Sequence, residues 1–427
     1  MSKVAILSMH TSPLAQPGTG DGGGMNVYVR ELAASLARSG RACEVYTRLW
    51  SPDLPGIVQV EPGFQVKHVA AGPLFPVAKE ELPDLVPEFA YRVARDLEAA
   101  ADRGEPADAL HANYWLSGMA GHSIKHELGI PLVSTFHTLD RLKAEEGLDT
   151  GEADGDTLSL LGQVRRAQGE SEVMACSDAI VASCSVEADQ IVELYGADRN
   201  RIAVIPPGVD RAYFSPGDRA QARRAVGLPV EGAMLLFVGR IQPLKGATVA
   251  VDALAHLGGP IAPGGAGSFL VVVGGPSGPH GPAELERLRA RVLERGLVDR
   301  VHFVEPQPHE LLSTYYRAAD VCVVPSRSES FGLVALEASA CGVPVVASAV
   351  GGLLTLVDHG STGYLVDERD PRVFAHFIAN ILTNPSLAGS MSAKAAMRAR
   401  GYTWHDAARA LASLYGRVSR RELVECG

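Results

Sequence analysis

The sequence predicts two α/β domains, each built on a doubly wound parallel sheet. Short apolar runs alternate with amphipathic segments, a pattern typical of repeated βα units. The series breaks at Pro206-Pro207-Gly208, and a second series then begins. The length of 427 residues also favours more than one domain, because single cores seldom grow beyond about 250–300 residues. We therefore expect an N-terminal domain over residues 1–208, completed by a C-terminal helix over 404–427, and a second domain over 209–403.

Each predicted strand is a short apolar run followed by polar or turn residues. In the first domain the runs are Val4–Met9, Cys43–Thr47, Ala109–His111, Leu132–Phe136 and Ala179–Ala182. In the second they are Met234–Val238, Phe269–Val273, Val301–Phe303, Val321–Pro325 and Pro344–Ala347. Apolar residues at helical spacing predict a helix after the first strand, starting near Met25 and ended by Gly40. Ligands of such sheets bind at the carboxyl ends of the strands.

The composition excludes several classes of function. The formal net charge is −10 and no basic block occurs, so neither nucleic acid nor an acidic membrane surface is an expected partner. No apolar run reaches membrane-spanning length, and the chain begins with a strand pattern rather than a signal peptide. The six cysteines show no CxxC spacing, so we expect reduced packing residues of a cytoplasmic protein, not a disulfide or zinc framework. They are Cys43, Cys176, Cys184, Cys322, Cys341 and Cys426.

A glycine-rich segment near the N-terminus matches a dinucleotide-binding pattern only weakly. Gly18, Gly20 and Gly23 fit GxGxxG, but a long proline-containing loop separates them from the first strand. The fingerprint requires a tight strand-to-helix turn, and an acidic residue after the next strand, where this chain has Arg48. We expect instead a loop whose last glycines, Gly22-Gly23-Gly24, open a helix with amides suited to phosphate. A plain glycine-rich turn is the alternative.

Two glutamates in PSRSESFGLVALEASACG are the strongest signal of chemistry. Glu329 and Glu337 are eight positions apart, so both can point the same way once the chain enters a helix. Ionised carboxylates only accept hydrogen bonds, which suits a ligand rich in hydroxyls. Gly332 and Gly351-Gly352 allow backbone amides to approach a ligand closely, as phosphate binding needs. The segment therefore predicts a nucleotide-sugar site, although two glutamates at this spacing also occur on solvated helices.

Two cations follow the first strand of the second domain, in FVGRIQPLKG. Arg240 and Lys245 are expected on the loop at the carboxyl end of that strand. There they can neutralise a diphosphate as negative charge develops on it. A solvated basic pair on a surface turn is the alternative interpretation.

Together these motifs resemble retaining glycosyltransferases of family four. That family has the GT-B architecture, two Rossmann-like domains facing a cleft. The resemblance covers essentially the whole chain, with GRIQPLKG, ESFGLVALEA and GGL in the expected order. Four segments are most similar to the mycothiol-pathway enzymes, namely MHTSPLAQPGTGDGGGMNVYVREL, AKEELP, YWLSG and TFHTL. Those enzymes transfer N-acetylglucosamine from its UDP derivative to inositol phosphate. The resemblance also implies a homodimer.

The resemblance implies a role for particular residues of this chain. A lysine, an arginine and two hydroxyls suit a phosphate monoester on the acceptor. The implied acceptor residues are His10, Asp21, Gly22, Gly23, Gly24, Met25, Asn26, Lys79, Tyr114, Thr138 and Arg166. The implied donor residues are Gly24, Arg240, Lys245, Gln307, Glu329, Glu337 and Gly352. His137, close to the reacting sugar, joins Arg240, Lys245 and Glu329 as the catalytic set.

The mechanism implied for the family is front-face substitution with retention, in which the departing phosphate takes the acceptor's proton. This chemistry requires no metal cofactor. Magnesium is an open possibility through Tyr316, Arg317 and Ala319, although the family's threonine is replaced here by Val343. Asp154-Gly155-Asp156 spells the DxD of metal-dependent transferases, and we interpret it as a solvated turn.

Three departures from the family leave the substrates open. Gln307 stands where the mycothiol enzymes have an arginine near the donor base. This chain has HANYWLSG where the family usually has HSHYWLSG. The segment that follows HTL, DRLKAEEGLDTGEADGDT, is also unlike the family's. A lincosamide-type antibiotic transferase, which joins a GDP-activated octose to the sulfur of ergothioneine, is therefore an alternative. A catalytically idle nucleotide-sugar sensor, an oxidoreductase and a sugar-nucleotide epimerase are further, less favoured alternatives.

Overall fold

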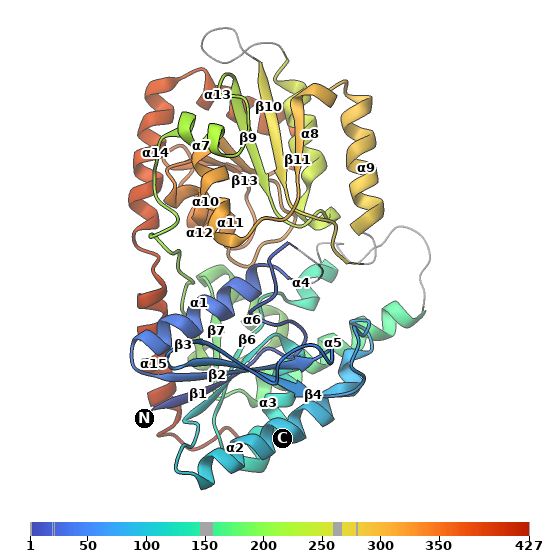
Figure 1. Cartoon of the computed structure of the whole chain (residues 1–427), viewed down its shortest axis with the longest axis vertical. Helices are drawn as coiled ribbons and strands as arrows, with labels where there is room; N and C mark the ends of the chain where they lie inside the picture. The colour runs from blue at the N-terminus through green and yellow to red at the C-terminus, as the bar shows by residue number, and fades with distance from the viewer. Residues whose placement is uncertain are drawn as a thin grey trace. The chain divides into compact units, whose positions relative to one another are not determined.

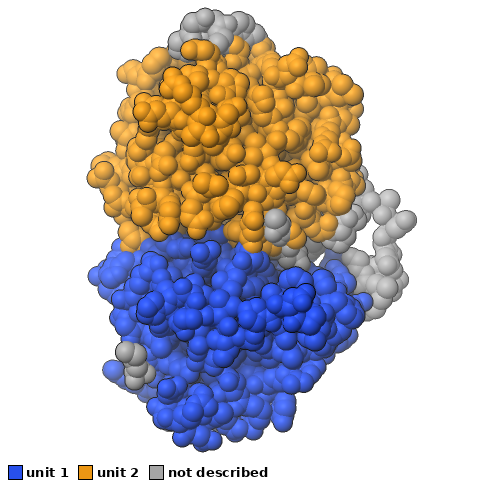
Figure 2. Space-filling model, in the orientation of Figure 1, with its two compact units in different colours: residues 1–15, 25–207, 404–427 blue, residues 16–24, 208–403 orange. Residues whose placement is uncertain are grey.

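The computed structural model describes residues 2–18, 20, 22–145, 157–258, 267–278 and 281–426, with only the backbone of 157–161. Asp21 and the Asp154–Asp156 turn of the sequence analysis lie outside these residues. The chain divides into two compact units (Figure 2). Unit 1 comprises Met1–Ala15, Met25–Pro207 and Trp404–Gly427, and unit 2 comprises Gln16–Gly24 and Gly208–Thr403. The glycine-rich segment Gln16–Gly24 thus groups with unit 2, whereas the sequence assigned it to the N-terminal domain.

Unit 1 is built on an eight-stranded sheet of order β3-β4-β2-β1-β5-β6-β7-β8 (Figure 1). All neighbouring strands are parallel except β3 and β4, which form an antiparallel pair. The strands are β1 (Lys3–Leu7), β2 (Ala42–Leu49), β3 (Ile57–Glu61), β4 (Phe64–Ala70), β5 (Ala109–Asn113), β6 (Leu132–Thr135), β7 (Ala179–Ala182) and β8 (Ile202–Val204). The helices are α1 (Gly24–Arg38), α2 (Val86–Asp102), α3 (Trp115–Leu128), α4 (Asp140–Glu145), α5 (Thr157–Cys176), α6 (Ser185–Tyr195) and α15 (Trp404–Val418), with short 3-10 turns η1 (Leu82–Leu85) and η2 (Arg199–Arg201).

Both faces of the unit 1 sheet are buried, so its central strands are apolar on both sides. Val4 and Ile6 of β1 pack with α1 and with α15, the helix that returns from the C-terminus. Ala5 and Leu7 face the opposite way and pack with α2 and α3. Alternate residues of a strand point to opposite faces, which explains why β1 reads as a continuous apolar run.

Unit 2 is built on a six-stranded, all-parallel sheet of order β11-β10-β9-β12-β13-β14. Leu236 and Leu235 of its central strand β9 face separate cores on the two sides. The strands are β9 (Ala233–Val238), β10 (Ser268–Val273), β11 (Val301–Val304), β12 (Val321–Val324), β13 (Val345–Ser348) and β14 (Gly363–Val366). The helices are α7 (Arg219–Ala225), α8 (Ala247–His256), α9 (Gly281–Glu294), α10 (His309–Ala318), α11 (Leu333–Ala340), α12 (Leu353–Leu356), α13 (Pro371–Leu382) and α14 (Pro385–Ala399), with 3-10 turns η3 (Pro243–Lys245) and η4 (Val298–Arg300).

The ten predicted strands are present, with ends shifted by at most two residues. Four further strands, β3, β4, β8 and β14, were not predicted. The hairpin β3–β4 carries partly exposed polar residues, and β8 is three residues long, so neither shows a long apolar run. Among the described residues, no helix is both long enough and apolar enough to cross a membrane.

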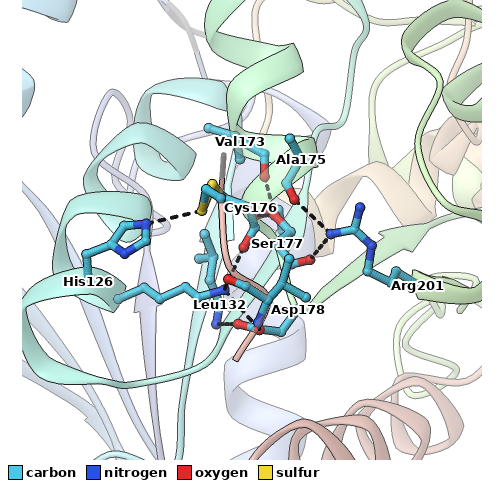
Figure 3. The surroundings of a disulfide bond; sticks show 12 residues. His126, Leu132, Val173, Ala175, Cys176, Ser177, Asp178 and Arg201 are labelled. Carbon is cyan, nitrogen blue, oxygen red and sulfur yellow. Dashed lines mark hydrogen bonds and ion pairs between the residues drawn. A yellow bond between two sulfur atoms is a disulfide. The ribbon is translucent and has the colours of Figure 1, made fainter. Parts of the chain in front are cut away.

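The expectation that all six cysteines are reduced is wrong for two of them. Cys176, the last residue of α5, forms a disulfide with Cys426 near the C-terminus (Figure 3). No local pattern indicates this pair, because 250 positions separate its members. Only the return of the chain through α15 brings them together. The other four cysteines are buried and form no disulfide with any described residue, as expected of packing residues.

Candidate functional site

Two predicted residues of unit 2, Lys245 and Glu329, form an ion pair. Lys245 ends η3, on the loop after β9, and Glu329 lies on the loop after β12. Because β9 and β12 are neighbouring parallel strands, both loops leave the same edge of the sheet. The Nζ of Lys245 lies 2.6 Å from Oε2 of Glu329, and both side chains are about one-fifth exposed. The hydroxyl of Ser326 donates to the same carboxylate oxygen at 3.2 Å.

A third loop, after β13, contacts the backbone of Glu329. The amide of Gly352 donates to the carbonyl of Glu329 at 2.9 Å. Gly351 has a φ of +47°, and a Cβ there would lie 1.9 Å from the same carbonyl oxygen. A side chain at residue 351 is therefore excluded by the close approach. The three sequence motifs of the second domain thus meet at Glu329.

Glu337 lies in a separate environment from Glu329, contrary to the expectation that one helix presents both. Helix α11 begins only at Leu333, after Gly332 with a φ of +101°, so Glu329 precedes the helix. The buried carboxylate of Glu337 accepts from the hydroxyl of Tyr316 at 2.8 Å and contacts Nε2 of His309 at 2.7 Å. Both partners belong to α10. The carboxylate is therefore fixed by its neighbours.

The remaining predicted donor residues lie on the loops after β9 and β11 or on the glycine-rich segment. Arg240 follows β9, and a Cβ on Gly23 would meet its Nε at 3.4 Å. Gln307 follows β11 and donates its side-chain amide to the carbonyl of Glu305 at 2.9 Å. Gly24 is the first residue of α1, and a Cβ there would lie 3.5 Å from the Leu333 side chain. The carbonyl of Gly22 accepts from the amide of Gly18 at 2.9 Å.

In unit 1, the predicted acceptor residues gather around the ring of Tyr114. The His10 ring lies against it, with the ring centroids 4.4 Å apart. The Nζ of Lys79 and the guanidinium carbon of Arg166 each lie 5.1 Å from the ring centroid. Arg166 also donates to the Thr138 hydroxyl at 2.9 Å. Five residues that are far apart in the sequence therefore form one cluster, with two cations on one aromatic ring.

Backbone strain marks this cluster. Tyr114 and His137 have φ values of 74° and 63°, and they are the non-glycine residues with positive φ among those described. Tyr114 is the first residue after β5, and His137 is the second residue after the neighbouring strand β6. Strain of this kind persists only where surrounding structure enforces it, and it concentrates at functional sites. Here the Tyr114 amide is held by the carbonyl of Thr135 at 2.8 Å.

His137 is held as a neutral imidazole. Its Nε2 lies 2.9 Å from Oδ1 of Asn113, so Nε2 carries the proton and donates it. Burial, and to a smaller extent the nearby His111, lower the pKa of His137 to about 3. The edge of Tyr28 packs against its ring. A neutral imidazole can donate or accept hydrogen bonds near a sugar but adds no positive charge there.

Asn26 fixes the loop that carries His10. Its Nδ2 donates to the Thr11 hydroxyl and to the Ser12 carbonyl, both at 2.6 Å. The neighbouring Met25 is partly buried and packs against two hydrophobic cores of unit 1. Asn26 therefore supports the loop after β1, and the predicted direct contact of Met25 and Asn26 with substrate stays a prediction.

The side chains of the magnesium candidates supply no carboxylate, so the magnesium site stays a prediction that would depend on main-chain carbonyls. The Tyr316 hydroxyl is engaged by Glu337, and the Arg317 guanidinium donates to the carbonyls of Ser215 and Tyr213. Ala319 and Val343 offer no side-chain oxygen. Magnesium prefers carboxylate and water oxygens in octahedral geometry. No step of the chemistry below is assigned to a metal.

Three residues that shape these sites were not singled out from the sequence. His309 and Ser326 orient Glu337 and Glu329, and Asn113 orients His137. A signal did exist for Asn113 and Ser326, which lie just beyond the carboxyl ends of predicted strands, whereas His309 is the first residue of the helix that follows β11. The sequence could not reveal which of the many polar residues there faces a carboxylate or a histidine.

The comparisons with known proteins now decide the family. The family model described as "Glycosyltransferase Family 4" matches residues 22–213, and the model described as "Glycosyl transferases group 1" matches residues 218–398. A D-inositol 3-phosphate glycosyltransferase of Acidothermus cellulolyticus is 45% identical over 414 residues, covering 97% of this chain and 90% of that protein. The chain belongs to glycosyltransferase family 4. A second such glycosyltransferase, of Actinosynnema mirum, is 45% identical over 423 residues and covers 98% of both chains.

Solved structures agree with this glycosyltransferase assignment. Sucrose-phosphate synthase from Thermosynechococcus elongatus has a TM-score of 0.86 and 32% identity, covering 98% of this chain and 99% of that chain. HepE of Anabaena, solved with UDP and glucose, has a TM-score of 0.72 at 18% identity, covering 98% and 100% of the chains, which shows a shared fold. The predicted GT-B class of two Rossmann-like units is thereby confirmed, and the dinucleotide-dependent oxidoreductase hypothesis is set aside.

Proposed function

We propose that this glycosyltransferase moves a sugar, with retention, from a nucleoside-diphosphate sugar to D-inositol 3-phosphate. The observation that carries the acceptor is the cluster on Tyr114. Lys79 and Arg166 supply two cationic side chains, and the Thr138 hydroxyl supplies a further hydrogen-bonding group. Arg166 is also paired with Glu170 at 2.8 Å and with Asp140 at 3.5 Å, so these carboxylates hold it in place and offset part of its charge. This set suits a phosphate monoester. The relatives named D-inositol 3-phosphate glycosyltransferase support the same acceptor.

The donor is assigned to the loops that meet at Glu329. Lys245 and Arg240 neutralise the diphosphate, the Glu329 carboxylate accepts from hydroxyls of the sugar, and Glu337 accepts from the ribose. The 2.6 Å ion pair supports this division, because it holds Lys245 at the point where a carboxylate can also meet the sugar. The resemblance to the mycothiol enzymes favours UDP-N-acetylglucosamine as the donor. Gln307, in place of their arginine, is a tolerated change under this proposal.

The proposed step forms one bond and breaks one. An acceptor hydroxyl oxygen attacks the anomeric carbon on the face that the diphosphate leaves, and its proton passes to the departing phosphate oxygen. Lys245 and Arg240 stabilise the charge that develops on the diphosphate. His137, neutral because burial lowers its pKa to about 3, acts through hydrogen bonds rather than charge. Binding both substrates in line supplies the remaining acceleration.

We further propose that turnover needs no divalent metal, since the cations Lys245 and Arg240 already face the leaving group in this scheme. The activity of protein treated with EDTA should equal that of untreated protein. A loss of activity that magnesium restores would overturn this part of the proposal.

The test is a transfer assay that pairs each donor with each acceptor. UDP-N-acetylglucosamine and the corresponding GDP sugar are combined in turn with inositol 3-phosphate, unphosphorylated inositol and ergothioneine. We expect product only with the UDP donor and inositol 3-phosphate, and retention by NMR of the new glycosidic bond. Transfer to ergothioneine, or equal use of unphosphorylated inositol, would overturn the proposal, the former in favour of the antibiotic pathway. Release of UDP from the donor alone would favour an epimerase or hydrolase.

A homodimer is also proposed, on the resemblance to relatives. Light scattering of the purified protein should give twice the chain mass of 45.0 kDa. A mass of one chain would overturn it.

A further inference from the structure

Four side chains with metal-binding atoms converge in unit 1, and none of them belongs to the candidate site described above. His122 and His126 lie four positions apart on α3, so they share one face of that helix, and their ring centroids are 4.8 Å apart. The other two are Cys176 and Cys426. One ligand atom from each of the four lies within 4.8 Å of all the others. The Nε2 of His126 lies 3.1 Å from the sulfur of Cys426, and Figure 3 shows its ring directed at the sulfur pair.

Contacts that do not involve sulfur hold the three contributing segments together. Lys125, between the two histidines on α3, forms an ion pair with Asp178 at 2.9 Å, and both side chains are at least 95% buried. Lys125 Nζ also donates to the Val424 carbonyl at 3.0 Å, and the Val424 amide donates to Asp178 at 2.7 Å. The C-terminal segment is therefore fixed two residues before Cys426. The four side chains are brought together whether or not the sulfur atoms are bonded.

We propose that His122, His126, Cys176 and Cys426 bind one Zn²⁺ when the two cysteines are reduced. Two thiolates and two neutral imidazoles form a Cys₂His₂ set, which zinc binds tetrahedrally in structural sites, and the thiolates neutralise its charge. Zinc–sulfur bonds of about 2.3 Å and zinc–nitrogen bonds of about 2.0–2.1 Å require ligand atoms roughly 3.3–3.8 Å apart. Distances below 4.8 Å are therefore close to those of an assembled site. A disulfide alone accounts for two of the four residues and leaves the paired histidines without a role.

The zinc-bound and disulfide forms are alternative states of the same two sulfur atoms. A dithiol reductant passes two electrons and two protons to the disulfide, giving two thiols, and is itself oxidised to a disulfide. Zinc binding to the thiols then releases two protons, because the ligands are thiolates. With four protein ligands the site has no open position for a substrate. The ion therefore has a structural role and holds the C-terminal segment against α3 and the end of α5.

The experiment uses the full chain, reduced, stripped of metal and titrated with Co²⁺ as a spectroscopic probe for zinc. We expect one Co²⁺ per chain, with thiolate-to-cobalt charge-transfer absorption and the strong visible bands of a tetrahedral site, all lost when Zn²⁺ is added. Oxidised protein, with Cys176 and Cys426 shown to be bonded by peptide mapping, should lack this absorption. Absence of charge-transfer absorption in the reduced protein would overturn the proposal.

Variants separate the site from adventitious binding. H122Q and H126Q retain both cysteines, so formation of the disulfide on oxidation shows that each variant has folded. Each should weaken cobalt binding at least tenfold and alter the visible bands, and C426S should abolish the charge transfer. The control H405Q changes an exposed histidine on α15 and should bind like the unsubstituted protein. Unchanged cobalt spectra and affinity in both H122Q and H126Q would overturn the site. Because the readout is metal binding, it is independent of the proposed sugar transfer.

Discussion

Lys245 and Glu329 form a 2.6 Å ion pair between two motifs that lie 84 positions apart. The pair exists because β9 and β12 are neighbours in a parallel sheet, so their following loops meet. In the proposed reaction Lys245 faces the leaving diphosphate. The pair therefore sets the lysine in place before the donor arrives, and preorganised charge of this kind requires little rearrangement in the transition state.

The first prediction concerns Lys245. K245A should lower kcat about 10²–10³-fold, the range observed when one preorganised electrostatic contact is removed. Its Tm should change little, because a partly exposed ion pair contributes only about 0–1 kcal/mol to stability. Steady-state kinetics and a thermal melt check both points, with K394A on α14 as the control. A kcat within a few-fold of the unsubstituted enzyme would contradict the assignment.

The second prediction concerns Lys79, the exposed cation on the Tyr114 ring. K79A should raise the KM for the phosphorylated acceptor about tenfold, because it removes one charged contact of roughly 1.5 kcal/mol. The affinity for UDP, measured by calorimetry, should not change. R165A, which removes an exposed arginine paired with Asp84, serves as the control. Equal rises in KM for donor and acceptor would show that Lys79 does not recognise the acceptor phosphate.

The third prediction concerns the support of Glu337 by Tyr316. The Tyr316 side chain is fully buried, and its hydroxyl donates to the Glu337 carboxylate at 2.8 Å. Y316F should reduce stability by about 1–3 kcal/mol and raise the donor KM, since a buried carboxylate oxygen loses a donor. Y315F, on the same helix, is the comparison. Denaturant unfolding measures the stability, and steady-state kinetics measure the donor KM. An unchanged donor KM would show that Glu337 does not take part in donor binding.

The fourth prediction is a pH dependence of stability from His111. This fully buried residue links the sheet to α15 through the Tyr415 hydroxyl at 2.6 Å, and it contacts the Thr135 hydroxyl at 2.8 Å. Burial lowers the pKa of His111 from 6.5 to about 3. Below pH 6.5 the unfolded chain therefore takes up a proton that the folded chain does not, so stability falls as the pH drops from 6.5 towards 3. The slope from this group is about 1.4 kcal/mol per pH unit.

The measurement for His111 is the free energy of unfolding at several pH values between 4 and 8. H111Q should be less stable at pH 8 but should show a shallower decline towards acid, because glutamine does not titrate. H405Q should keep the original slope. Parallel curves for H111Q and the unsubstituted protein would mean that other groups carry the acid dependence.

Local sequence patterns were sufficient for the sheet strands that are buried on both faces. Each gave an apolar run, so ten strands and the break at Pro206-Pro207-Gly208 could be predicted. The edge hairpin β3–β4 was missed because an edge strand with polar residues has no such run. Glu329 and Glu337 were singled out as carboxylates of a nucleotide-sugar site, and that role stays a prediction. Their shared helix was wrong, because Gly332 delays the start of α11.

The sequence by itself determined the class of the protein, since the order of βα units, the motif spacing and the resemblance all survive without coordinates. Tertiary structure alone decided which side chains meet. Tyr114 gathers His10, Lys79 and Arg166, and Cys176 meets Cys426 across 250 positions. The physical reason is that strand and helix periodicities are local, whereas these contacts depend on which loops leave the same sheet edge and where the C-terminal chain returns. No local pattern records that return.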